Sequence, residues 1–385
     1  MGKIKVFLIF LILGRIFLFF IYKKQPRKIR EAIILLGWNE QNNSAFSALG
    51  GYGVTKKNMI QKIRTAESVA IGHPDKICDQ ISDAILDACL KIDPHSRVAV
   101  ETMGGHGHIY LTGEITSHAN PDYSAIAKKI YRECGNKDKI EVFVNVVKQS
   151  PQIKAGVDIG GAGDQGIMVG YACDQTKELL PLEIVLSRQL TKAMGARDGK
   201  SQVTIENGKI AKVITSVCGK DYPKELIDLL KQWGIKEKDE RWLKNPAGNW
   251  TIGGFKADTG LTGRKLIVDN YGPNVSIGGG CFSGKDATKV DRSAAYMARK
   301  IAVDLIKEKK AQEVFVKLAY AIGKAEPLMA TAELHYKNKP VEFISHIKGY
   351  DLTPAGIIKF LDLQKPIYLE TAKYGHFGNG FKWDR

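Results

Sequence analysis

The sequence predicts an α+β protein built from several similar sheet-and-helix units. Two observations support this fold class: apolar residues recur with helical spacing over 74–91, and short stretches of alternating apolar residues follow this segment. The same alternation of helix and strand then returns twice along the chain. At 385 residues and 44% apolar composition, the chain is long enough for two or three such units.

The first predicted helix begins at Pro74, a residue that favours the first turn of a helix. Its apolar stripe includes Ile77, Ile81 and Ile85. The opposite face carries a carboxylate at every fourth position, namely Asp75, Asp79, Asp83 and Asp87. Like charges at this spacing destabilise an isolated helix. We expect a cation to balance Asp75 at the helix start, and solvent to accommodate Asp83 and Asp87.

The remaining elements follow from the same two periodicities. Strands are predicted at 97–102, 108–115, 141–147, 201–206, 210–217, 265–269 and 313–322, and helices at 123–133, 183–194, 224–233 and 289–307. Asn207 and Gly208 form a typical turn between two of these strands. A small portion of mixed helix and strand ends the chain.

Charge is distributed unevenly along the sequence. The formal net charge is +16, and residues 1–58 hold +8 of it. The other 327 residues therefore have a modest basic excess, which suits a small polyanion as well as a nucleic acid. We predict no nucleic-acid partner. The six cysteines are scattered without a paired spacing, which favours a reducing, cytoplasmic location.

Residues 6–22 form an apolar run that contains Arg15 and is near the lower length limit for a membrane span. No small-residue cleavage site follows, so a secretory signal peptide fits poorly. A membrane anchor, a buried leader helix and a start-site artefact with the native start at Met59 are the three interpretations. We favour the artefact, because the motifs below begin just after Met59.

The segment GGGCFSGKD at 278–286 is the most informative stretch. Its glycines allow backbone N–H groups to approach anionic oxygens, and Lys285 adds a positive charge, so the pattern indicates phosphate binding. Position 286 is Asp, where a Walker loop requires a hydroxyl for magnesium. An ordinary P-loop is therefore excluded, and a purely structural glycine turn remains the alternative.

Charged residues surround this glycine loop in the sequence. Arg264 and Lys265 precede it, and Lys289, Asp291 and Arg292 open the helix that follows. Any one of them is compatible with a solvated surface. Asp75 and Asp291 are suitable magnesium ligands if the fold brings them together. A second glycine-rich segment, 160–166, has the alternative interpretation of a hinge or lid.

Seven segments resemble, in the same order, the signature segments of S-adenosylmethionine synthetases. They are ESVAIGHPDKICDQISD (67–83), GAGDQG (161–166), DGKSQV (198–203), GLTGRK (260–265), GGGCFSGKD (278–286), KVDRSAAY (289–296) and YGHFG (374–378). Together they extend over 59–385. The resemblance implies a cytoplasmic methionine adenosyltransferase. Its three similar domains, at 59–155, 160–250 and 251–385, would follow an N-terminal extension, 1–58.

The resemblance also implies roles for individual residues. His73, Lys285, Arg264 and Asp291 would form the catalytic set, Asp75 and Asp291 would bind Mg²⁺, and Glu101 would bind K⁺. Methionine would contact Glu114, Gln149, Asp258 and Lys289. ATP would contact His73, Asp164, Asp198, Lys200, Asn249, Trp250, Asp258, Arg264, Lys265, Cys281 and Lys285.

Some positions depart from the family pattern. Cys281 replaces a small Ala or Ser, Ile71 replaces a Glu, and Asn249-Trp250 stands where Arg-Phe is common. The segment between Gln149 and Gly161 is also short, which predicts an abbreviated lid.

The implied reaction makes S-adenosylmethionine from ATP and L-methionine and hydrolyses the triphosphate to pyrophosphate and phosphate. By the same resemblance, we expect a homodimer or homotetramer with active sites between subunits. A kinase-like phosphoryl-transfer enzyme and a membrane-tethered nucleotide-binding protein are the two rival interpretations.

Overall fold

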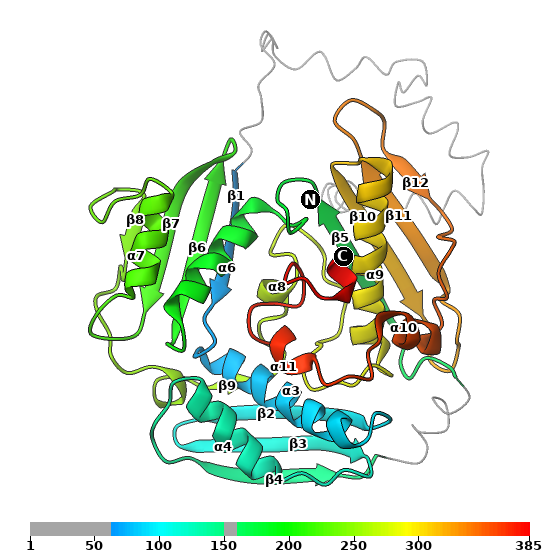
Figure 1. The fold of residues 1–385 in the computed structure, drawn as a ribbon, viewed down its shortest axis with the longest axis horizontal. Coiled ribbons are helices and arrows are strands. Elements are labelled where there is room, and N and C mark those ends of the chain that lie inside the picture. Colours follow the sequence, from blue (N-terminus) through cyan, green and yellow to red (C-terminus); the bar gives the residue numbers. More distant parts are fainter. Residues whose placement is uncertain (1–62, 150–159) are drawn as a thin grey trace, which may run out of the picture. The chain divides into compact units, whose positions relative to one another are not determined.

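A computed structural model describes residues 63–149 and 160–385 of the chain. This part contains three four-stranded sheets, each covered by helices (Figure 1). The predicted apolar segment 6–22 and the predicted short lid after Gln149 lie outside the described residues. In the described ranges, none of the helices combines the length and hydropathy that a membrane span requires.

The first sheet has the strand order β4-β3-β2-β9. Helices α3 and α4 cover one face of it, and the buried apolar residues of β2 and β3 point toward them. The elements are α3 (Pro74–Ile92), β2 (Arg97–Gly105), β3 (His108–Thr116), α4 (Tyr123–Glu133), β4 (Glu141–Val147) and β9 (Gly260–Leu261).

The second sheet has the order β1-β6-β7-β8. Helix α6 packs on β1 and β6, and α7 packs on α6. Asn207 and Gly208, both with positive φ (50° and 78°), form the predicted turn between β6 and β7. The elements are β1 (Ile63–Val69), α6 (Leu182–Met194), β6 (Gly199–Glu206), β7 (Lys209–Val217), α7 (Lys224–Gln232) and β8 (Trp242–Lys244).

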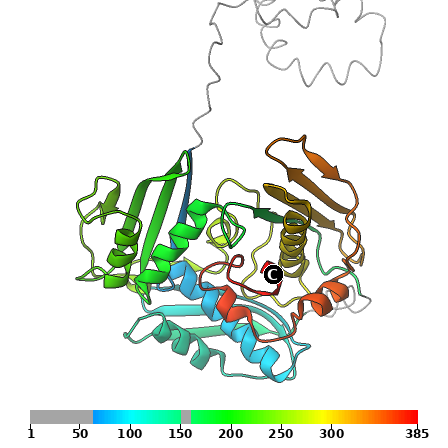
Figure 2. The same cartoon turned by 45° about the horizontal axis from the view of Figure 1, so that its top comes forward.

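The third sheet has the order β12-β11-β10-β5. The long helix α9 packs on β5 and β10, and α10 packs on α9, as the turned view in Figure 2 also shows. The elements are β5 (Gly166–Cys173), α9 (Val290–Lys309), β10 (Glu313–Tyr320), β11 (Met329–His335), β12 (Glu342–Ile344) and α10 (Pro354–Leu361).

The three sheets repeat one plan, which confirms the predicted fold class. In each, a helix leads into an antiparallel hairpin, and a strand from another part of the chain pairs antiparallel with the first hairpin strand. These added strands are β9, β1 and β5. Each sheet therefore contains strands from two of the three predicted domain ranges, 59–155, 160–250 and 251–385. The boundaries of these domains stay a prediction.

The predicted strand at 265–269 is wrong. Leu266–Asp269 is the short helix α8, in which Asp269 N–H donates to the Lys265 carbonyl at 2.8 Å. Arg188, fully inside the protein, donates to the carbonyls of Val268, Asp269 and Asn270 at the end of this helix. A cation at a helix C-terminus is favourable, and a run of three apolar residues is too short for periodicity to separate helix from strand.

The aspartates of α3 point into the protein, and the expectation that solvent accommodates Asp83 and Asp87 is wrong. Asp83 is fully buried in an ion pair with Arg292. The Asp87 carboxylate accepts hydrogen bonds from the backbone of Tyr368 and Leu369, at the start of α11 (Tyr368–Thr371). Helix α3 is thus a central element, since almost every residue from Pro74 to Leu86 is buried.

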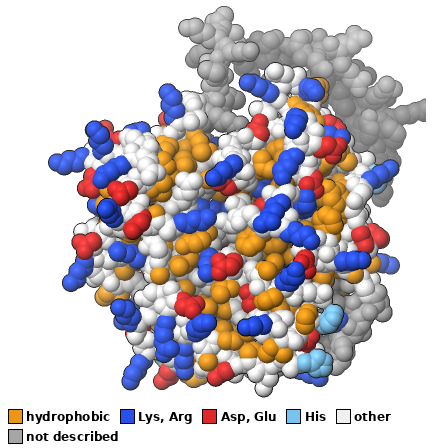
Figure 3. Space-filling model, viewed as in Figure 1, with side chains coloured by type: hydrophobic (Ala, Val, Ile, Leu, Met, Phe, Trp, Pro, Cys, Tyr) orange, Lys and Arg blue, Asp and Glu red, His pale blue; other side chains and the backbone are white. Residues whose placement is uncertain are grey.

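Charges of both signs are mixed on one face of the molecule (Figure 3). Figure 3 shows lysine and arginine side chains interspersed with acidic ones over the face that it draws. A protein that follows a phosphate backbone concentrates its basic residues into a patch or stripe.

The raised pKa of the Asp87 carboxyl leads to a prediction of how folding stability depends on pH. Burial raises its pKa to about 6 despite the two hydrogen bonds it accepts. The unfolded pKa is about 3.9, so between these values the folded chain binds a proton that the unfolded chain lacks. The contribution of Asp87 to stability is complete below about pH 3.9 and is lost as the pH rises through 6.

We therefore expect Asp87→Asn to gain stability relative to the wild type between pH 4.5 and 7, measured as urea midpoints. Asp93→Asn is the matched control. The pKa of Asp93 is lowered, first by the hydrogen bond from His118 N–H, so its contribution stays nearly constant over this window. A constant difference between Asp87→Asn and the wild type would contradict the prediction.

Candidate active site

The site is built around the N-terminus of α3. His73 is the N-cap residue, and its Nδ1 accepts a hydrogen bond from the Asp75 N–H at 3.1 Å. Pro74 occupies the first turn, where its missing N–H costs nothing. Asp75 follows in that turn with 1% of its surface exposed, and the positive end of the helix dipole favours its charge.

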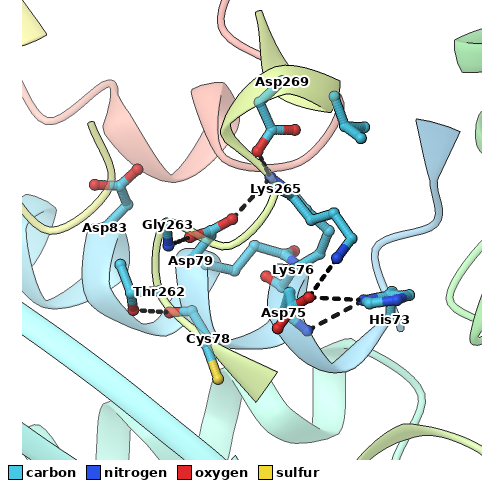
Figure 4. A network of polar contacts seen from close by, with 12 residues as sticks. His73, Asp75, Lys76, Cys78, Asp79, Asp83, Thr262, Gly263, Lys265 and Asp269 are labelled. Atoms are coloured by element: carbon cyan, nitrogen blue, oxygen red, sulfur yellow. Dashed lines mark hydrogen bonds and ion pairs between the residues drawn. The ribbon is translucent and has the colours of Figure 1, made fainter. Parts of the chain in front are cut away.

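Two cations converge on Asp75 from the loop before α8. Lys265 Nζ lies 2.5 Å from Oδ2 and Arg264 Nε lies 3.3 Å from Oδ1. The Leu261 N–H also donates to Oδ1, at 3.0 Å. Burial alone would raise the pKa of Asp75, but the bonds from Lys265 and Leu261 outweigh burial and lower it. Figure 4 shows this carboxylate between His73 and Lys265.

His73 is held in its neutral form. Burial, followed by the nearby Lys265, lowers the pKa of His73 to about 3. Because Nδ1 accepts the bond from Asp75 N–H, the single ring proton is on Nε2. His73 therefore offers one neutral hydrogen-bond donor at neutral pH. Lys200 and Asp258 are close enough to affect the same pKa, so both lie near this group.

The loop that carries Arg264 and Lys265 is fastened to α3 at two points. Gly260 lies against the helix start, where a Cβ would overlap the Pro74 carbonyl. The Gly263 N–H donates to Asp79 Oδ1 at 2.8 Å. Lys76, fully buried, bridges Asp79 at 3.2 Å and Asp269 at 2.7 Å. The contacts that Gly260 and Gly263 make with α3 therefore fix the positions of Arg264 and Lys265.

A second charged group lies in the glycine loop. Lys285 Nζ contacts Asp291 Oδ2 at 2.7 Å. Burial lowers the pKa of Lys285, but this bond and the nearby negative charges together outweigh burial and raise it. Gly280 packs so closely on Asp291 that a Cβ there would overlap the carboxylate. Asp164 is near enough to raise the same pKa. Lys285, Asp291 and the Gly280 backbone are therefore in direct contact.

The two charged groups adjoin at Gly263 and Cys281. Gly263 has φ +82°, and a Cβ on it would lie 2.7 Å from Cys281 Cβ. Lys285 and Asp291 are close enough to affect the pKa of the Cys281 thiol, so Cys281 lies near both groups. Burial raises this pKa, so the side chain is uncharged at neutral pH.

A third region surrounds the segment 249–254. The Asp198 carboxylate accepts a hydrogen bond from Gly254 N–H at 2.8 Å. A Cβ on Gly253 would lie 2.9 Å from Asp198 Cβ and 3.1 Å from the Trp250 ring, so these three residues pack together. Asn249 accepts a hydrogen bond from Asn245. A cavity of about 390 Å³ opens beside Asp198, with Arg197 and Gly253 in its wall.

The sequence analysis missed the turn that supports the second glycine-rich segment. The Ala162 N–H donates to the Lys324 carbonyl and the Gly323 N–H donates to the Ala162 carbonyl, both at 2.8 Å. A Cβ on Gly161 would overlap the Gly323 backbone. Ile322, in this turn, is 64% exposed. No local signal marks it, because the pairing of β5 with β10 brings the two segments together.

Of the residues expected at methionine and K⁺, Asp258 lies near the Asp75 group, and Glu101 is close enough to Cys281 to affect the pKa of its thiol. Glu101 and Glu114 lie on β2 and β3, on the face away from α3 and α4. Gln149 follows β4, and its Oε1 is buried without a hydrogen-bond partner in the described part of the chain. Lys289 pairs with Asp286, which also accepts a bond from Val98 N–H.

The two candidate magnesium ligands are in different groups, Asp75 with Arg264 and Lys265, and Asp291 with Lys285. Over 63–149 and 160–385, no cluster of three or more His, Cys, Asp or Glu side chains is placed to hold a metal ion. A magnesium ion that used these carboxylates would take its other oxygens from phosphate or water, as Mg²⁺ commonly does.

Comparison with known proteins identifies the family. Three family models match in order: the N-terminal domain of S-adenosylmethionine synthetase at 61–154, the central domain at 159–232, and the C-terminal domain at 252–385. The chain belongs to the S-adenosylmethionine synthetase family.

Its relatives in this family match over almost their whole length. The protein named S-adenosylmethionine synthase from Brachyspira hyodysenteriae is 42% identical over 380 residues. The match covers 83% of this chain and 95% of that protein. The protein of the same name from Mesoplasma florum is 43% identical over 368 residues, which cover 85% and 98%. A third, from Mycoplasmopsis synoviae, is 43% identical over 364 residues, which cover 84% and 95%.

The contact of Gly260 with α3 predicts a stability effect in this synthetase fold. In Gly260→Ala, the added Cβ meets backbone atoms of Pro74 that cannot move aside, so we expect a loss of roughly 1–3 kcal/mol. Gly279→Ala is the control. Its Cβ meets nothing within 4 Å, so its stability should stay within about 0.5 kcal/mol of the wild type. Equal urea midpoints for both variants would refute this packing argument.

Proposed function

We propose that this chain synthesises S-adenosylmethionine from ATP and L-methionine. The observation that carries the proposal is the pair of adjoining charged groups, Asp75 with Arg264 and Lys265, and Asp291 with Lys285, in a member of the S-adenosylmethionine synthetase family. The three cations and the neutral His73 can bind the negatively charged oxygens of a triphosphate. The activity is that named for the family's relatives.

The chemistry needs positioning more than acid–base catalysis. The methionine sulfur attacks C5′ of ATP, an S–C5′ bond forms, and the C5′–O bond breaks with its electron pair going to the triphosphate oxygen. The thioether has no proton to lose, so no general base is required. Charge develops on the leaving oxygen, where preorganised cations lower the barrier most effectively.

His73, Arg264, Lys265 and Lys285 supply that stabilisation in the proposed reaction. The low pKa of His73 makes it a neutral Nε2–H donor, which can contact a phosphate oxygen without titrating near neutral pH. The cations are paired with Asp75 and Asp291 and are thereby held in place before substrate arrives. We propose that the triphosphate is then hydrolysed to pyrophosphate and phosphate at the same cations.

Mg²⁺ and K⁺ are the proposed cofactors. Asp75 and Asp291 fit Mg²⁺ by their chemistry, since carboxylate oxygens are its preferred protein ligands, and Glu101 would hold K⁺. When bound, these ions would neutralise phosphate charge. Each aspartate is paired with a lysine, so both positions already balance a positive charge, which supports the proposal.

The remaining roles are also proposals. Asp164, Asp198, Lys200, Asn249, Trp250, Asp258 and Cys281 would line the ATP site, and Glu114, Gln149, Asp258 and Lys289 would contact methionine. Glu114 and Glu101 are on an uncovered sheet face, and Gln149 Oε1 is buried without a partner in the described residues. These positions support a site that a second subunit completes.

The same sheet face supports a homodimer or homotetramer. Exposed apolar residues gather there, among them Met103, Tyr110, Phe143 and Val147. The rings of Tyr110 and Phe143 stack at 5.0 Å. A contiguous exposed apolar surface of this kind usually marks an interface. We also propose the domain ranges 59–155, 160–250 and 251–385 and a cytoplasmic location.

Replacing Lys285 tests the proposed function. With ATP, Mg²⁺, K⁺ and methionine, we expect the wild type to form S-adenosylmethionine, pyrophosphate and phosphate, separated by chromatography. Lys285→Met should lower kcat by about 10²–10³-fold, because it removes a cation from the developing charge. Lys317→Met, on the exposed side of β10, is the matched control and should turn over normally.

Other outcomes would point elsewhere. Formation of ADP without a sulfonium product would favour phosphoryl transfer, and binding of ATP without turnover would favour a nucleotide-binding protein. Full activity of Lys285→Met would remove the main support for the assignment.

Phe143→Glu tests the proposed interface. A buried, unpaired carboxylate in an apolar contact is costly, so we expect this variant to sediment as a single chain at concentrations where the wild type is a dimer or larger. Ile92→Glu, at the exposed C-terminal end of α3, should leave the assembly unchanged. A single-chain mass for the wild type itself would reject the proposed interface.

A further inference from the structure

A buried ion pair lies directly behind the glycine loop. Arg292 Nη1 and Nη2 contact the two oxygens of Asp83 at 2.7 and 2.8 Å, and both side chains are 0% exposed. A buried pair of this kind is costly to desolvate and is favourable only when its remaining hydrogen-bonding atoms are also satisfied. The partners that satisfy those atoms indicate what the pair does.

Both members of the pair also bind the backbone of the glycine loop. Gly284 N–H donates to Asp83 Oδ1 at 2.8 Å, and Arg292 Nη1 donates to the Lys285 carbonyl at 3.0 Å. Gly284 has φ +80°, and a Cβ on it would overlap the Val100 carbonyl. The loop is therefore held at two successive residues, one of which carries the Lys285 side chain.

The other side of the guanidinium is fixed from the C-terminal segment. Arg292 Nη2 donates to Thr371 Oγ1 at 2.9 Å, and Nε donates to the Tyr296 hydroxyl at 3.1 Å. The Tyr368 ring lies 4.3 Å from the guanidinium carbon. Arg292 thus has little freedom to move, and neither has the loop that it binds.

We propose that Asp83 and Arg292 are positioning residues that act through Lys285. The pair holds the loop so that Lys285 Nζ stands beside Asp291, where the triphosphate is expected, and this inference rests on the proposed function. A lysine at 292 would keep the charge but could not bind Asp83 with two N–H groups and the Lys285 carbonyl at once.

A double-mutant cycle separates positioning from general stability. We expect Arg292→Lys in the full chain to lower kcat by about 10–100-fold, as a displacement of about 1 Å can do. In the Lys285→Met background, the same change should lower kcat by less than about 3-fold, because the group it positions is gone. The urea midpoint should fall equally in both backgrounds.

Arg299→Lys is the matched control, because Arg299 is an equally buried arginine of α9 whose bonds go to Asp384 and to backbone carbonyls outside the glycine loop. It should lower the urea midpoint while kcat stays within about 2-fold of the wild type. If Arg292→Lys lowers kcat by the same factor in both backgrounds, or if Arg299→Lys lowers kcat as much, the proposal is wrong. Asp83→Asn, which keeps an acceptor for Gly284 N–H, replaces Arg292→Lys if that variant does not fold.

A second readout is independent of turnover. Calorimetric affinity for inorganic tripolyphosphate should fall about 10-fold in Arg292→Lys and should not change when Lys285→Met is already present. If the wild type makes no S-adenosylmethionine but this affinity cycle holds, the proposed function fails and the positioning role stands. If the wild type is active and the cycle shows no coupling, the positioning role fails alone.

Discussion

The rest of this structure depends on four aspartates spaced every fourth residue along α3. Asp75, Asp79 and Asp83 each accept a backbone N–H from a loop that carries a cationic side chain, and Asp87 accepts two from the start of α11. A helix repeats its side-chain direction every three to four residues, so one face presents these carboxylates in line. Figure 4 shows three of them along α3.

This arrangement turns a feature that should destabilise a helix into the means of holding the site together. Like charges at i and i+4 repel, but here Asp75, Asp79 and Asp83 are buried and each meets a different cation: Lys265 and Arg264 at Asp75, Lys76 at Asp79, and Arg292 at Asp83. Removing one partner would leave a buried charge uncompensated, which is strongly unfavourable. Fold and site are therefore coupled through α3.

The three repeated sheets explain how distant segments reach this helix. Each sheet takes one strand from another part of the chain, and β9, the strand added beside β2, leads directly into Arg264 and Lys265. Likewise β5 follows the 160–166 segment and pairs with β10, which brings Ala162 against the turn at Gly323. Exchange of strands between units thus places the charged loops next to one another.

The sequence by itself determined most helices and strands, the fold class, the family, and the two charged loops, because periodicity and glycine-flanked cations are local patterns. It did not determine that Leu266–Asp269 is helical, because a short apolar run fits either structure. The environment of Asp83 and Asp87, the added strands and the contact of Gly323 with the 160–166 segment are features of the tertiary structure alone. These depend on long-range backbone pairing and on the dielectric of the interior, which no local pattern encodes.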